Sequence, residues 1–252
     1  MGKLKLYFFN TLILLVSSII LQIINIFFNV YISNTIGEEA VGIFALVMSV
    51  YAFGITLASA GINIATTRVV SEELASNNEL GSKKIASRCI AFSLLFGIIA
   101  SLIFFILADF IVQRCLHNNV IYLICIALPF ISMSSAINGY FTAVRKVSKN
   151  AISKFFEEFI KILCTSIFLS SNTAKKITYA CYYLILADVI SEVLSFFALY
   201  IFYKLDRKKS LLESRYKDLD TYNKRILRIT IPVALTSYLR SGLSTVKQLL
   251  IP

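Results

Sequence analysis

The chain alternates long apolar stretches with short polar connections, and this pattern predicts its architecture. A helix needs about 20 mostly apolar residues to cross the hydrocarbon core of a bilayer. Six stretches come close to or exceed that length, and a seventh begins after a charged segment. The predicted spans are residues 9–33, 41–66, 85–112, 120–143, 155–171 and 179–203, followed by the apolar segment 226–252.

The second apolar stretch is the most informative one. It runs from Val41 to Ala65 without a charged residue, and Arg68, Glu72 and Glu73 follow it. We expect one unbroken membrane-spanning helix that continues into a charged, helical surface segment. The many small residues in this stretch favour close packing against other helices.

Composition also indicates a membrane protein. Of the 252 residues, 58% are hydrophobic and only 15% are charged, whereas a soluble domain carries about 25% charged residues. The predicted fold class is therefore all-α, a polytopic transmembrane helix bundle. We divide the chain into a six-helix N-terminal lobe (1–203), a charged linker (204–225) and the truncated start of a second lobe with its seventh helix (226–252).

The net charge of +11 reflects membrane topology rather than a nucleic-acid partner, because the basic residues lie in connections between apolar stretches. Those on alternate connections gather on one predicted side, which places the N-terminus and the 204–225 linker in the cytoplasm. We expect a multi-pass protein of a bacterial plasma membrane, with membrane lipid as its surroundings. The basic residues on that side, besides those of the linker, are Lys3, Lys5, Arg68, Lys83, Lys84, Arg88, Arg145, Lys146, Lys149 and Lys154.

Motifs of enzymes and metal sites are missing from the sequence. The five cysteines are scattered and have no metal or redox spacing. There is no glycine-rich phosphate loop, Gly-Xaa-Ser-Xaa-Gly or His-Glu-Xaa-Xaa-His. We expect no enzymatic activity, no cofactor and no metal.

Three segments carry a family resemblance: Ile36–Phe44 (IGEEAVGIF), Gly61–Ala75 (GINIATTRVVSEELA) and Ile231–Thr245 (IPVALTSYLRSGLST). Together they resemble the multidrug/oligosaccharidyl-lipid/polysaccharide exporter superfamily. The similarity is strongest to its stage V sporulation protein B group, a polysaccharide biosynthesis group that resembles lipid II flippases.

This resemblance implies two six-helix bundles around a central cavity and transport without covalent chemistry. The implied substrate is an undecaprenyl-diphosphate-linked oligosaccharide, a precursor of peptidoglycan or spore cortex. Members of the superfamily are roughly twice as long as this chain. We therefore expect either the N-terminal half of a longer protein or a second-lobe polypeptide as partner.

A transporter that carries a diphosphate needs cationic side chains in a water-filled cavity. The candidates are Arg68, Lys161 and Arg240, since charges inside a membrane are costly and point to function. Two of them have structural alternatives: Arg68 with Glu72, and Lys161 with Glu157, are each spaced to form an ion pair along one helix.

Polar groups on one helix face complete the candidate site. Asn25 and Asn29 lie one turn apart in the first span, so we expect both to face the protein interior and the cavity. Asp188 and Glu192 have the same spacing in the sixth span. This pair could bind Na⁺ or a proton and couple transport to an ion gradient, or it could neutralise Lys161 or Arg240.

Three functions remain open at the level of sequence. The first is a lipid-linked oligosaccharide flippase that works by alternating access. The second is a cation-coupled multidrug exporter of the same superfamily, in which Asp188 and Glu192 would provide the coupling. The third is a truncated, non-transporting membrane protein.

Overall fold

The computed structural model describes residues 2–115, 118–170, 177–208 and 219–250, and its regular secondary structure is α-helical. The predicted all-α bundle is thereby confirmed. Helix extends into both ends of the predicted linker, whose middle (209–218) lies outside the described residues. The helices are α1 (Gly2–Ile36), α2 (Glu38–Ser59), α3 (Ile62–Ala75), α4 (Glu79–Cys115), α5 (Asn118–Ala143), α6 (Val147–Ser170), α7 (Ile177–Lys208) and α8 (Leu219–Leu250).

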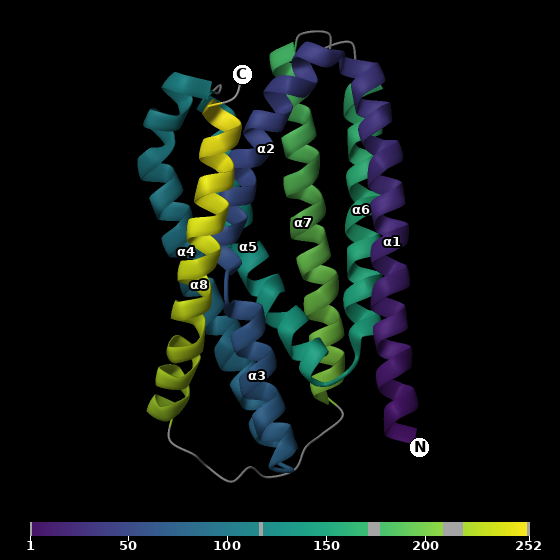
Figure 1. Cartoon of the computed structure of the whole chain (residues 1–252), viewed down its shortest axis with the longest axis vertical. Helices are drawn as coiled ribbons and strands as arrows, with labels where there is room; N and C mark the ends of the chain where they lie inside the picture. The colour runs from purple at the N-terminus through teal and green to yellow at the C-terminus, as the bar shows by residue number, and fades with distance from the viewer. Residues whose placement is uncertain (1, 116–117, 171–176, 209–218, 251–252) are drawn as a thin grey trace.

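The helices run up and down along one common direction (Figure 1). α1 leads away from the N-terminus, α2 and α3 return together, and α4 to α8 then alternate in direction. The start of α1, the connections α3–α4 and α5–α6, the end of α7 and the start of α8 consequently lie at the same end, which we call the basic end. Arg88, Arg145 and Lys149 belong to this end, as the alternation of spans requires.

Five stretches of the described chain are long and apolar enough to cross a membrane, which makes this a multi-pass membrane protein. Two predicted segments, 155–171 and 226–252, fall outside that set. They correspond to α6 and α8, and α6 begins at Val147 rather than at residue 155. Several charged side chains of α6 pair with α1 and α7. The qualifying stretches are Thr11–Ile36, Ala40–Ala75, Glu79–Ile106, Tyr122–Ala143 and Tyr179–Asp206.

The prediction of an unbroken helix through the second apolar stretch is wrong at one point. α2 ends at Ser59, Gly61 has φ +78°, and α3 begins at Ile62. Only glycine adopts this left-handed conformation without strain. α8 also passes close to Gly61. A Cβ atom on Gly61 would lie only 2.7 Å from the carbonyl oxygen of Thr230 in α8. The expected helical continuation of the charged segment is confirmed, since α3 reaches Ala75.

Close packing of α2, α4, α5 and α7 forms the centre of the bundle. Ala58 is fully buried in an apolar cluster with Phe104 and Leu128, as the small residues of this stretch predicted. At Gly97 of α4, a Cβ atom would lie 2.6 Å from Cα of Pro129 in α5. This close packing fixes the position of α7, which carries Asp188 and Glu192, within the bundle.

A buried carboxylate fixes the lower end of α7. Asp206 accepts hydrogen bonds from the Tyr140 hydroxyl at 2.9 Å and from Lys149 Nζ at 3.3 Å, and it also pairs with Lys146. These partners come from α5, from the α5–α6 connection and from the start of α6. The contact therefore sets the position of α7, and of the acidic residues along it, relative to α6.

Candidate functional site

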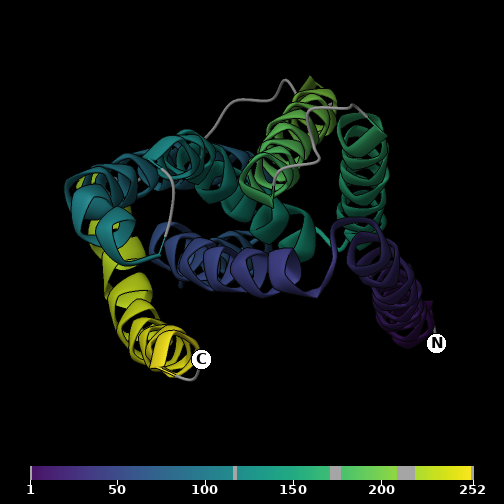
Figure 2. The ribbon, with the colours of Figure 1, turned by 90° about the horizontal axis from the view of Figure 1, so that it is seen from above.

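A cavity of about 520 Å³ lies between α1, α2, α6 and α8. Seen along the bundle, α1 and α6 stand on one side and α8 on the other, with α2 between them (Figure 2). Among the lining residues that the structure describes, Lys161 carries the only charge. The polar lining residues are Asn25, Asn29, Ser49, Lys161, Ser241, Ser244, Thr245 and Gln248.

The Lys161 side chain contacts a residue on α7, which does not line the cavity, and an aromatic ring on α1. Its Nζ atom lies 2.6 Å from Asp188 Oδ1 on α7 and 5.9 Å from the ring centroid of Phe28 on α1. The exposed fractions of the two charged side chains are only 19% and 10%. Pairing of this kind is how a buried charge is tolerated. An ammonium group has three donors, so one pairing leaves donors for the cavity.

The helical pair expected between Lys161 and Glu157 does not form. Glu157 instead accepts from Lys154 Nζ at 2.6 Å and from the Ser195 hydroxyl at 3.0 Å. The partner of Lys161 comes from a different helix. The sequence left two roles open for Asp188, ion coupling and neutralisation of a cation. In this conformation Asp188 pairs with Lys161.

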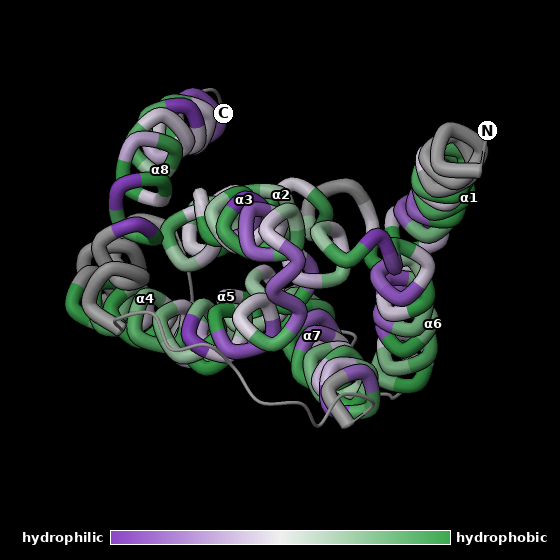
Figure 3. The backbone as a smooth tube through the Cα atoms, turned by 90° about the horizontal axis from the view of Figure 1, so that it is seen from below, coloured by the Kyte–Doolittle hydropathy of each residue, from purple (hydrophilic) through white to green (hydrophobic). Residues whose placement is uncertain are grey.

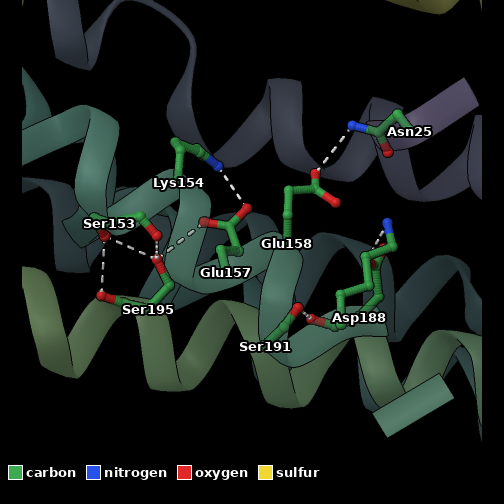
Figure 4. Close-up of polar contacts among 9 residues, drawn as sticks. Asn25, Ser153, Lys154, Glu157, Glu158, Asp188, Ser191 and Ser195 are labelled. Carbon is green, nitrogen blue, oxygen red and sulfur yellow. Dashed lines mark hydrogen bonds and ion pairs between the residues drawn. The ribbon is translucent and has the colours of Figure 1, made fainter. Parts of the chain in front are cut away.

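Polar contacts join α6 to α1 and α7 next to the cavity (Figure 4). Asn25 Nδ2 donates to Glu158 Oε1 at 3.2 Å, and the hydroxyls of Ser153 and Ser195 lie 3.0 Å apart. Asn25 is therefore partly buried and directed at α6, whereas Asn29, which was expected to face the interior as well, is exposed where it lines the cavity. We call the charged residues here the α6–α7 network, which consists of Lys154, Glu157, Glu158, Lys161, Asp188 and Glu192.

Carboxylates outnumber ammonium groups in the α6–α7 network by four to two. The Glu192 side chain makes no hydrogen bond or ion pair with any residue in the described ranges, although the charges of Glu157, Lys154, Asp188 and Lys161 all act on it. Glu158 Oε2 and the Tyr51 hydroxyl are buried without a partner in the described structure. Such a surplus attracts protons or monovalent cations. Within these same ranges, no group of three or more His, Cys, Asp or Glu side chains is arranged to hold a metal ion.

The structure separates the three predicted cations. Arg68 lies on α3, where its Nε atom is 3.1 Å from Glu72 Oε1, the ion pair that its spacing allowed. Arg240 is exposed on α8 and does not line the cavity. The face of α8 that lines the cavity carries Ser241, Thr245 and Gln248 instead. Of the three predicted cations, only Lys161 lines the same cavity as Asn25 and Asn29.

Sequence reasoning missed the hydroxyl-bearing side of the cavity. Thr245 Oγ1 donates to the backbone oxygen of Ser49 at 3.2 Å and thereby joins α8 to α2. The signal was present, because Ser241, Ser244, Thr245 and Gln248 recur at the period of a helix face. It was obscured by the more conspicuous charge of Arg240 in the same segment.

The chain is similar to known proteins in both sequence and fold. The sequence model described as "Polysaccharide biosynthesis protein" matches residues 8–251. The chain belongs to this polysaccharide biosynthesis protein family. Within the curated proteins, it is 24% identical over 235 residues to "Stage V sporulation protein B" of Bacillus subtilis (strain 168), a match that covers 88% of this chain and 44% of that protein.

Solved structures of the wider superfamily share the fold of this family member. A MOP superfamily transporter from Pyrococcus furiosus matches with a TM-score of 0.73 at 15% identity, over 90% of this chain and 51% of that one. A MATE structure in the straight conformation matches with a TM-score of 0.75 at 16% identity, over 92% and 52%. The chain therefore spans about half the length of the relatives it matches, and the predicted exporter superfamily is confirmed.

Proposed function

We propose that this chain forms one half of a transporter that moves a lipid-linked anionic oligosaccharide across the bacterial plasma membrane. The observation that carries the proposal is the position of Lys161 in the wall of a cavity that Asn25 and other polar side chains also line. A diphosphate that links sugar to lipid needs a cation in such a place. Asn25, Asn29, Ser49 and Thr245 offer hydrogen bonds to sugar hydroxyls.

The comparisons support this substrate class. The family description names polysaccharide biosynthesis, and the Bacillus subtilis relative is named for sporulation. An undecaprenyl-diphosphate-linked precursor of peptidoglycan or spore cortex fits both descriptions. The basic end of the bundle would face the cytoplasm, where such precursors are made.

Alternating access is the proposed mechanism, with a second half of the transporter facing the half described here. An inward-facing MATE transporter matches this chain with a TM-score of 0.64, and an outward-facing one with 0.66. The similar agreement supports a half that keeps its fold while the two halves move against each other. The second half is supplied either by a continuation of this polypeptide or by a separate polypeptide.

A cation-coupled exporter of the same superfamily is the second candidate. The surplus of carboxylates in the α6–α7 network favours it, since Asp188 and Glu192 would exchange Na⁺ or protons with the cavity. The two candidates differ in the charge of their substrate. Export that depends on Lys161 indicates an anionic substrate, whereas export that survives its loss and requires Glu192 indicates coupling to a cation.

Export in cells tests the proposal through Lys161→Met. We expect at least roughly a tenfold loss of precursor reaching the outer surface, because one charge-assisted contact to the diphosphate disappears. The quantity to measure is lipid-linked precursor accessible from outside, at equal protein level in the membrane. Lys154→Met is the matched control, since Lys154 belongs to the same helix and does not line the cavity.

Loss of folding has to be separated from loss of substrate binding. The double variant Lys161→Met/Asp188→Asn removes the ion pair as a unit and leaves neither partner's charge behind. We expect it to insert normally and still fail to export precursor. Normal export by either variant would overturn the role of Lys161 and with it the proposed function.

A further inference from the structure

Apart from the central cavity, a second pocket of about 630 Å³ lies between α3 and α8. Its charged lining consists of Arg68, Arg225 and Arg228 together with Glu72. The charged residues of the pocket lie toward the basic end from Gly61 and Thr230, where α8 approaches the start of α3. In the view from that end, both α3 and α8 show hydrophilic segments (Figure 3).

Positive charge exceeds negative charge among the described residues of this pocket. Glu72 engages Arg68 through Oε1 at 3.1 Å and Arg225 through Oε2, so both of its oxygens are occupied. Arg228 has no hydrogen bond or ion pair with any described residue. Each guanidinium has five N–H donors, and most of them remain available. The pocket therefore has two positive charges in excess and a large unused set of donors.

Polarity changes along the pocket in the same direction on both helices. α3 descends toward the basic end, so Ile64 lies one turn above Arg68. α8 ascends from that end, so Ile229, Pro232 and Val233 follow Arg228 upward. Donors for an anion are thus found toward the basic end of the pocket, and apolar walls lead from them toward the middle of the bundle.

We propose that this pocket binds a membrane lipid through its phosphate or diphosphate group, with the hydrocarbon chain along the apolar walls. Basic pockets between membrane helices on the cytoplasmic side recognise anionic headgroups in this way. Guanidinium groups suit the ligand because their planar forks bind phosphate oxygens in pairs. Glu72 keeps Arg68 and Arg225 oriented toward the site when no lipid is bound.

Lipid binding to the purified full chain tests the proposal. Native mass spectrometry compares phosphatidylglycerol with phosphatidylcholine of the same acyl chains, and it then compares undecaprenyl diphosphate with undecaprenol. We expect the anionic member of at least one pair to bind more tightly than its neutral partner. Arg228→Gln is expected to reduce that binding roughly fivefold, and Arg228→Lys is expected to retain most of it.

Arg88→Gln provides the matched control. It removes one positive charge from an exposed position of the same end, on α4 and outside the pocket. We expect no change in binding by this variant. Equal losses for Arg228→Gln and Arg88→Gln, or no preference for either anionic lipid, would overturn the site.

The two lipid arms identify the source of the phosphate. Tight binding of phosphatidylglycerol that undecaprenyl diphosphate does not displace indicates a bulk membrane lipid. Displacement by undecaprenyl diphosphate indicates a polyprenyl diphosphate. The site is independent of the proposed function, because Lys161 lies in the other cavity.

Discussion

Lys161 and Asp188 show how much of a buried ion pair is visible in a sequence. A lysine within an apolar stretch marks a costly position, and Lys161 was recognisable on that ground. Its partner was not, because the local spacing suggested Glu157 while the nearest carboxylate in space belongs to α7. Only the packing of α6 against α7 determines which of two acidic residues receives the ammonium group.

At the scale of the residue, we expect strong coupling between Lys161→Met and Asp188→Asn in thermal unfolding of the detergent-solubilised chain. Each single variant leaves one buried group without its partner and should lower the free energy of unfolding by roughly 1–3 kcal/mol. The double variant should cost less than the sum of the two. Strictly additive effects would show that the 2.6 Å contact does not contribute to stability.

The break between α2 and α3 is the clearest contribution of a single element to the architecture. A continuous apolar pattern predicted one helix, and hydropathy alone contains no sign of the interruption. The left-handed conformation of Gly61 and the approach of Thr230 explain it together. α8 can therefore pass closely here, and the charged residues Arg68, Arg225 and Arg228 of the pocket lie toward the basic end from this approach.

At the scale of the element, Gly61→Ala should weaken the contact between α8 and the α2–α3 break. The added Cβ would lie 2.7 Å from a backbone oxygen at φ +78°, so we expect a loss of about 1–2 kcal/mol in unfolding free energy. Gly42→Ala is the control, because Gly42 lies within helix α2 and a Cβ there would contact nothing within 4 Å. Equal stability of the two variants would contradict the explanation.

The whole molecule has one basic end, and this is a property of sequence and topology together. Basic residues cluster in alternate connections, and the alternating direction of the helices brings those connections to the same end. The positive-inside rule then predicts that this end faces the cytoplasm. The charged residues of the α3–α8 pocket would accordingly be accessible from the cytoplasmic surface.

Membrane orientation can be measured by cysteine labelling in a background whose five native cysteines are replaced by alanine. A cysteine at Arg88 should react with a membrane-impermeant maleimide in inside-out vesicles and not in intact cells. A cysteine at Thr35, exposed near the opposite end of α1, should show the reverse. Labelling of Arg88→Cys from outside intact cells would contradict the orientation on which the proposed function depends.

The sequence by itself determined the membrane class, the helical fold, the exporter superfamily and the distribution of basic connections. The membrane class, the helical fold and the basic connections follow from local hydropathy and charge, which need no knowledge of neighbouring helices. The superfamily followed from the resemblance of three segments to its known members. The tertiary structure decided the partner of Lys161, the break at Gly61 and the separation of Arg68 and Arg240 from the central cavity. Each of these depends on which helix faces pack together, because a contact between helices far apart in the chain is set by their mutual position and rotation rather than by spacing along one of them.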